Sequence, residues 1–131
     1  MKENIYSIWS PLDGVEGRVY VDHIIDDEEG LTIYLYLSSN GGEKKFKMTF
    51  DPYIAYRNMD ESFRSKAFSE HGGFDNSLNI VSNSSWIRWL QSESQGYYQE
   101  AKIVHYCIIT DADFIDVLAE FPPEVEWVYG S

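Results

Sequence analysis

The sequence predicts an α+β fold: an antiparallel β-sheet, made of a meander and a C-terminal hairpin, with one or two helices packed on one face. Three observations predict it. Three segments between residues 18 and 51 alternate apolar and polar side chains, which is the two-residue period of half-buried strands. Residues 84–96 carry apolar side chains at helical spacing. A chain of 131 residues, 44% of them hydrophobic, suits one packed domain spanning residues 1–131.

The meander is the best-defined region. Strands are expected at residues 31–37 and 45–50, and an earlier strand should present Val19, Val21, His23 and Ile25 on the matching face. Acidic residues and Gly30 form the first connection, and the second contains the Asn40-Gly41 pair typical of hairpin turns. The residues predicted to line the core are Leu31, Ile33, Leu35, Phe46, Met48 and Phe50.

The other elements follow in chain order. Short strands are expected at residues 4–9, 53–56 and 78–81. A short helix over 60–70 should be capped by Asp60, with Phe63 and Ala67 on one face, and residues 71–73 should end it. A second helix should start at Ser84 or Ser85 and stop by Gly96. Strands at 103–110 and 115–119 form a hairpin across 111–113, and a last strand covers 125–128. We expect Trp86, Ile87 and Leu90 to cover the apolar face of the meander.

Charge limits the choice of partners. Ten Lys and Arg against 22 Asp and Glu give a net charge of −12, which repels nucleic acid and anionic membranes and leaves cationic partners possible. The one cysteine, Cys107, excludes an internal disulfide. No apolar run has the length of a signal peptide or a membrane span, so the expected location is cytoplasmic.

Catalytic motifs are weak. Asp111 and Asp113 follow an apolar strand at the spacing used by haloacid-dehalogenase-type phosphatases, but only 18 residues follow, without Lys or Arg. A hydrolase using these two residues is the least favoured alternative, and a polar turn explains them better. The histidines, His23, His71 and His105, show no metal-ligand spacing, and Cys107 lies within an apolar strand. We therefore expect no enzyme activity, metal or cofactor.

The C-terminal segment stands out by its charge. Residues 103–131 contain six acidic residues and neither Lys nor Arg. Carboxylates beside aromatic anchors are typical of surfaces that bind cationic proteins. The predicted partner-binding residues are Asp111, Asp113, Asp116, Glu120, Glu124, Glu126, Trp127 and Tyr129. A second acidic run, over residues 22–29, is a rival surface, and a solvated coat without a partner is the alternative explanation.

Two stretches resemble a known class of protein. The first stretch is residues 53–62, and the second runs from Ser85-Trp86 through residues 94–97 and His105-Tyr106 to residues 116–118. They are similar to patterns in small acidic bacterial immunity proteins of polymorphic toxin systems. The resemblance implies a non-enzymatic cytosolic protein that binds and neutralises a cognate, basic toxin domain, such as a nuclease. The alternative is an acidic protein-interaction or structural domain with another partner.

Overall fold

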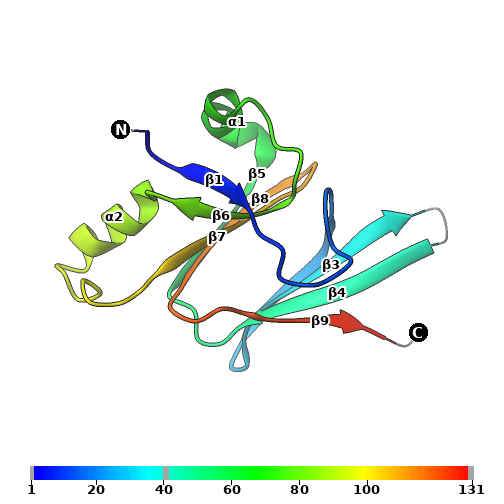
Figure 1. Cartoon of the computed structure of the whole chain (residues 1–131). Coiled ribbons are helices and arrows are strands. Elements are labelled where there is room, and N and C mark those ends of the chain that lie inside the picture. Colours follow the sequence, from blue (N-terminus) through cyan, green and yellow to red (C-terminus); the bar gives the residue numbers. More distant parts are fainter. Residues whose placement is uncertain (1, 40–41, 130–131) are drawn as a thin grey trace.

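The alternating segments form the first of two antiparallel sheets in the computed structural model, which describes residues 2–39 and 42–129. Four strands lie in the order β2 (Tyr20–Asp27), β3 (Gly30–Ser39), β4 (Gly42–Phe50) and β9 (Glu124–Val128) (Figure 1). The predicted strands are confirmed. The Asn40-Gly41 turn itself lies outside the described residues.

One face of this sheet is the centre of the core. All six predicted core residues, Leu31, Ile33, Leu35, Phe46, Met48 and Phe50, are fully buried. The outer face carries the tyrosines and lysines: Tyr20 packs on Tyr36, and Lys47 lies over the ring of Tyr34. The two-residue period therefore predicted both faces of β3 and β4.

The face predicted for β2 is wrong beyond Val21. A β-bulge shifts the register between Val21 and His23, so that Ile24, opposite Ile33, turns toward the core. His23 and Ile25 are exposed instead. A bulge adds one residue to one strand and reverses the alternation after it.

The remaining strands build a second, five-stranded sheet. Its order is β1 (Ile5–Ile8), β6 (Leu78–Ser82), β7 (Val104–Ile109), β8 (Asp113–Ala119) and β5 (Ala55–Asp60), and every pair is antiparallel. The predicted hairpin of residues 103–119 is β7 and β8. β5 begins at Ala55, two residues later than the predicted strand at 53–56, and continues to Asp60 because it pairs with β8 from Leu118 to Asp113.

The two sheets pack face to face. Leu78, Tyr106, Ile108, Ile115 and Val117 from the second sheet join the core residues of the first in one cluster. The predicted cover of Trp86, Ile87 and Leu90 is therefore wrong, and a sheet rather than a helix closes the core. The predicted α+β class is confirmed, and its strands divide between two sheets.

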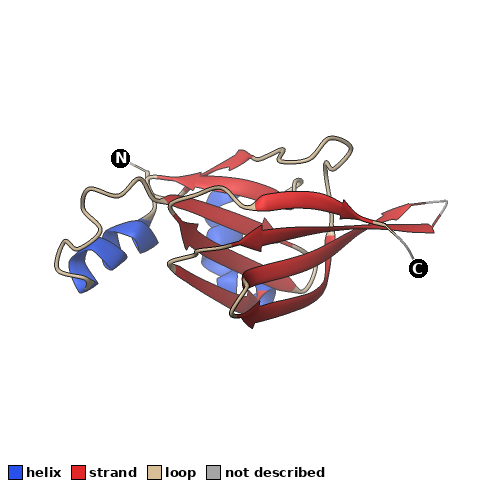
Figure 2. Cartoon of the chain, turned by 90° about the horizontal axis from the view of Figure 1, so that it is seen from below, coloured by secondary structure: helices blue, strands red, loops and turns tan. Residues whose placement is uncertain are grey.

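The helices lie on the other face of the five-stranded sheet (Figures 1 and 2). A 3₁₀ turn, η1 (Glu61–Arg64), leads into α1 (Ser65–His71), and α2 (Ser85–Glu93) follows β6. Asp60 caps η1 as predicted, and Gly72 ends α1 with a left-handed backbone at φ 83°. Ala67 packs against the sheet, but Phe63 is 75% exposed, because the tighter 3₁₀ turn places it off that face.

Candidate functional site

Acidic residues far apart in the sequence meet at one end of the molecule. The β2–β3 turn, the β4–β5 connection and the β8–β9 connection all lie at the lower end in Figure 1. We call the seven carboxylates on these loops the acidic end: Asp26, Asp27, Glu28, Glu29, Asp51, Glu120 and Glu124. The two rival acidic runs of the sequence therefore contribute to the same surface.

Specific contacts hold these loops together. The Tyr53 hydroxyl donates a hydrogen bond to Asp26 over 2.8 Å, and the Ile54 amide donates to the Leu118 carbonyl over 2.8 Å. Gly30 lies against the next loop so closely that a Cβ there would meet the Phe50 carbonyl oxygen at 2.5 Å. The β4–β5 connection thus bridges the other two.

The acidic end is charged and carries one apolar anchor. Within the described residues, none of the seven carboxylates forms an ion pair within 4 Å. Lys102, two residues before β7, supplies a cation toward this end, since Val104 pairs with Ala119. Phe121, next to Glu120, is 58% exposed. An exposed aromatic ring amid carboxylates combines apolar burial with electrostatic attraction.

Two of the predicted binding residues lie away from this end. Asp113 is the first residue of β8 and Asp111 precedes it by two residues, so both lie more than about 20 Å along the chain from Glu120 at ~3.3 Å per residue. Asp111 forms an ion pair with Arg18. Asp113 accepts one hydrogen bond from the Thr110 hydroxyl in its own turn and one from the Asn58 side chain of β5, each at 3.4 Å. Neither residue belongs to the acidic end.

Asp116 is a correction to the predicted surface. Its side chain is fully buried and accepts hydrogen bonds from Arg57 at 3.0 Å and Arg64 at 2.7 Å. Burial alone would raise its pKa, but hydrogen bonding and charge from His105, with the two arginines, outweigh burial and lower the pKa far below its usual range. A fully buried carboxylate cannot contact a protein partner.

The remaining predicted residues divide between surface and core. Glu120 and Glu124 belong to the acidic end, whereas Glu126 lies 3.4 Å from Lys47 on the outer sheet face. Trp127 is half-buried and packs edge-on against Phe46 in the core. Tyr129 is 84% exposed beyond β9. The predicted C-terminal segment is therefore not one surface.

A second polar feature lies beneath the helices. The Ser84 hydroxyl lies 2.7 Å from His105 Nδ1, and His105 Nε2 lies 2.7 Å from Asp116 Oδ1. His105 Nε2 carries a proton and donates it to the Asp116 carboxylate, while Nδ1 shares the second hydrogen bond with the Ser84 hydroxyl. Ser84 also caps α2 by accepting the Ile87 amide at 3.1 Å.

This serine–histidine–aspartate chain supports the fold. Ser84, His105 and Asp116 are all buried, and the Trp86 ring lies edge-on to His105 at 5.7 Å. A nucleophile must reach its substrate, and Ser84 is only 5% exposed. The network instead fixes the start of α2 to the sheet and satisfies buried polar groups that would otherwise destabilise the fold.

Sequence reasoning missed this network, although one signal was present. Asp116 interrupts an otherwise apolar strand, and the predicted hairpin places it opposite Cys107, next to His105 on the same sheet face. The arginine partners gave no signal, because Arg57 and Arg64 are 59 and 52 residues away in the sequence.

Comparisons with known proteins add no family to this description. No protein-family model matches the chain, and neither curated proteins nor solved structures gave a significant match. Within residues 2–39 and 42–129, no helix combines the length and apolar character needed to cross a membrane. In the same residues, no three His, Cys, Asp or Glu side chains gather as metal ligands would.

Proposed function

We propose that this protein binds a cationic protein partner through its acidic end, and that its role is that of a cytoplasmic immunity protein that neutralises a basic toxin domain. The observation that supports binding is the meeting of three loops, which gathers seven carboxylates at one end of the molecule, with exposed Phe121 on one of these loops. The immunity role rests on the sequence resemblance of residues 53–62 and 85–118.

The arrangement supports binding in two ways. Unpaired carboxylates attract a cationic partner over the Debye length, about 8 Å at physiological salt, and so speed association. Phe121 can enter an apolar pocket of the partner, where a buried aromatic ring slows dissociation. A nuclease cleft that accepts phosphates would accept carboxylates in their place.

Co-expression with a panel of basic nuclease toxin domains tests the proposal. The wild-type protein should protect the cell and bind the purified toxin domain. A variant with Glu28, Glu29, Glu120 and Glu124 changed to Lys should lose both properties, because it replaces four of the seven carboxylates with cations. None of the four makes a side-chain hydrogen bond within the described structure, so the fold should survive.

The matched control changes Asp13, Glu16, Asp75 and Glu93 to Lys. These residues are exposed and lie outside the acidic end, and both variants have the same net charge of −4. The control should bind like the wild type. Equal loss in both variants would show that only overall charge matters, and unchanged binding in both would contradict the acidic end as the binding surface.

A further inference from the structure

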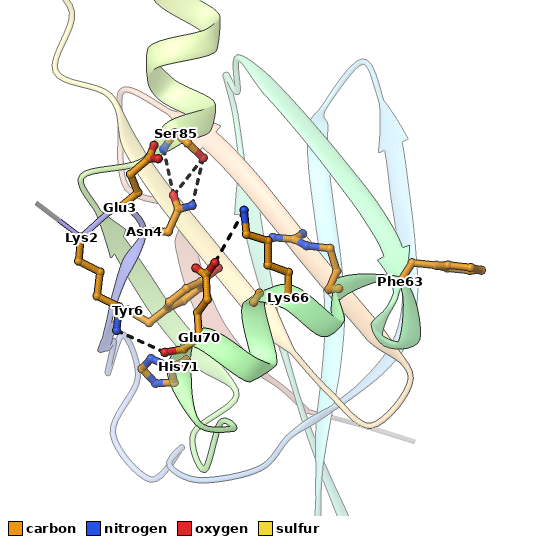
Figure 3. Close-up of a pocket in the computed structure, with 11 residues that line it drawn as sticks. Lys2, Glu3, Asn4, Tyr6, Phe63, Lys66, Glu70, His71 and Ser85 are labelled. Atoms are coloured by element: carbon orange, nitrogen blue, oxygen red, sulfur yellow. Dashed lines mark hydrogen bonds and ion pairs between the residues drawn. The ribbon is translucent and has the colours of Figure 1, made fainter.

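A cleft lies between the two helices, away from the acidic end. It has a volume of about 590 Å³, within the size range of small-ligand sites. Figure 3 shows Lys66 and Glu70 of α1 on one side, with Asn4 and Ser85 on the other. A shallower hollow beside Trp86 and Trp89 shares Ser85 with the cleft.

Two arginines that line these hollows are held by Asp116. Arg64 lines the cleft and Arg57 lines the shallower hollow, and each donates one hydrogen bond to Asp116 Oδ2. Each guanidinium also lies on an aromatic ring, Arg57 at 4.3 Å from the Trp86 centroid and Arg64 at 3.9 Å from that of Phe114. A guanidinium has five N–H donors, so both retain donors for a ligand.

Other donors line the same cleft. The Tyr6 hydroxyl has no hydrogen-bond partner within the described residues, and burial, followed by the nearby Cys107 and Asp116, raises its pKa so that it stays protonated. Lys66 adds a flexible ammonium group. Its pair with Glu70, at 3.7 Å and with Lys66 89% exposed, is weak enough for a ligand to displace.

Acidic residues offset only part of this charge. Glu3 and Glu70 also line the cleft, but Glu3 forms an ion pair with Arg88. Lys2, Arg64 and Lys66 supply three cations from two sides. The lining thus has three cations and two carboxylates, on a protein whose net charge is −12.

We propose that this cleft binds a phosphate-bearing ligand, with Arg64, Lys66 and Tyr6 as its donors. A planar carboxylate ligand can be satisfied by a single arginine that binds both of its oxygens. A tetrahedral phosphate instead accepts hydrogen bonds from donors in several directions. Donors from α1, η1 and β1 match the phosphate. Exposed Trp89, beside the shallower hollow, offers a ring face for the organic part of the ligand. This site is independent of the acidic end.

Calorimetric titration at constant ionic strength tests the site with inorganic phosphate, adenosine monophosphate, a phosphoserine peptide and acetate. We expect saturable binding of phosphate and weaker binding of acetate. A stronger response to the nucleotide or to the phosphopeptide identifies the source of the phosphate. Lys66→Gln and Tyr6→Phe should each weaken binding about tenfold, because Lys66→Gln removes a charge-assisted hydrogen bond and Tyr6→Phe removes a buried one. Amide NMR shifts should map to Tyr6, Arg64 and Ser85.

Lys102→Gln is the matched control, since it removes the same charge outside the cleft and should bind like the wild type. Arg64→Gln should abolish binding, but it also disturbs Asp116, so the other two variants decide. The proposal is overturned if no phosphate probe saturates by about 10 mM, if acetate binds as tightly as phosphate, or if both variants match the wild type.

Discussion

Asp116 shows how a single residue can change the meaning of a charge pattern. In the sequence it is one of six acidic residues in a segment without Lys or Arg. In the structure it is buried and paired with Arg57, Arg64 and His105. Arg18 and Lys47 likewise pair with Asp111 and Glu126. Charge compensation for this segment comes from distant parts of the chain.

Replacing Asp116 with Asn should lower the free energy of unfolding by about 3 kcal/mol, the lower end for breaking a buried pair, because Arg57 is partly exposed and can be solvated. The folded-state pKa of Asp116 is lowered, so its contribution is present above the unfolded pKa of about 3.9 and is lost as pH falls below it.

The stability gap between wild type and Asp116→Asn should therefore be constant from about pH 5 to 7 and should narrow below about pH 4. Urea unfolding of both proteins across this range measures it. Glu93→Gln, an exposed change on α2, is the control and should leave stability within about 0.5 kcal/mol of wild type at pH 7. A gap that is unchanged down to pH 2 would contradict the assigned charge state of Asp116.

Cys107 should be chemically silent in the folded protein. It is fully buried, and burial, with the neighbouring Asp116 carboxylate, raises the pKa of its thiol well above the usual value. A thiol reagent such as Ellman's should react only as the protein unfolds, with one equivalent released in denaturant. Rapid stoichiometric reaction under native conditions would show that β7 is accessible.

At the scale of elements, the faces of a strand could be predicted from the sequence only where one face is buried and the other exposed. β3 and β4 have one core face and one solvent face, and their two-residue alternation gave both faces correctly. β7 and β8 are covered on both sides, by the other sheet and by the helices. Their near-continuous apolar sequences therefore predicted the two strands, but not which side chains point to which face of the sheet. No local sequence pattern indicated the β2 bulge or the 3₁₀ turn before α1. The bulge changed the face predicted for His23 and Ile25, and the 3₁₀ turn changed the face predicted for Phe63.

The candidate site was predictable only in part. The acidic turn at residues 26–29 and the residues Glu120 and Glu124 were visible as charges, but their meeting depends on how the β4–β5 connection joins the two sheets. Sequence proximity placed Trp127 beside them, whereas strand alternation in β9 turns that ring toward Phe46. Phe121, which follows the last residues of β8, was not singled out.

Leu35→Ala tests the packing of β3 against the second sheet. Leu35 is fully buried and opposite Phe46, so the change should lower the free energy of unfolding by about 2–5 kcal/mol. Ile25→Ala on the same sheet is the matched control, because Ile25 is 40% exposed and should cost less than about 1 kcal/mol. Equal costs in denaturant unfolding would show that the assigned register is wrong.

For the whole molecule, the separation of charge has a stability cost. Seven of the ten cations form ion pairs with carboxylates outside the acidic end, while the acidic end has seven carboxylates without an ion pair within 4 Å in the described structure. Mutual repulsion of such charges opposes folding. A surface retained despite that repulsion is consistent with a use in binding.

That repulsion can be measured without a partner. Changing Glu28, Glu29, Glu120 and Glu124 to Lys should raise the free energy of unfolding by about 1 kcal/mol at 0.01 M salt, since each change relieves repulsion among neighbouring carboxylates. The gain should disappear near 1 M salt, where the Debye length falls from ~30 Å to ~3 Å. The variant changed at Asp13, Glu16, Asp75 and Glu93 has the same net charge of −4 and should gain less. Equal gains in the two variants would mean that repulsion is spread over the whole surface and is not concentrated at the acidic end.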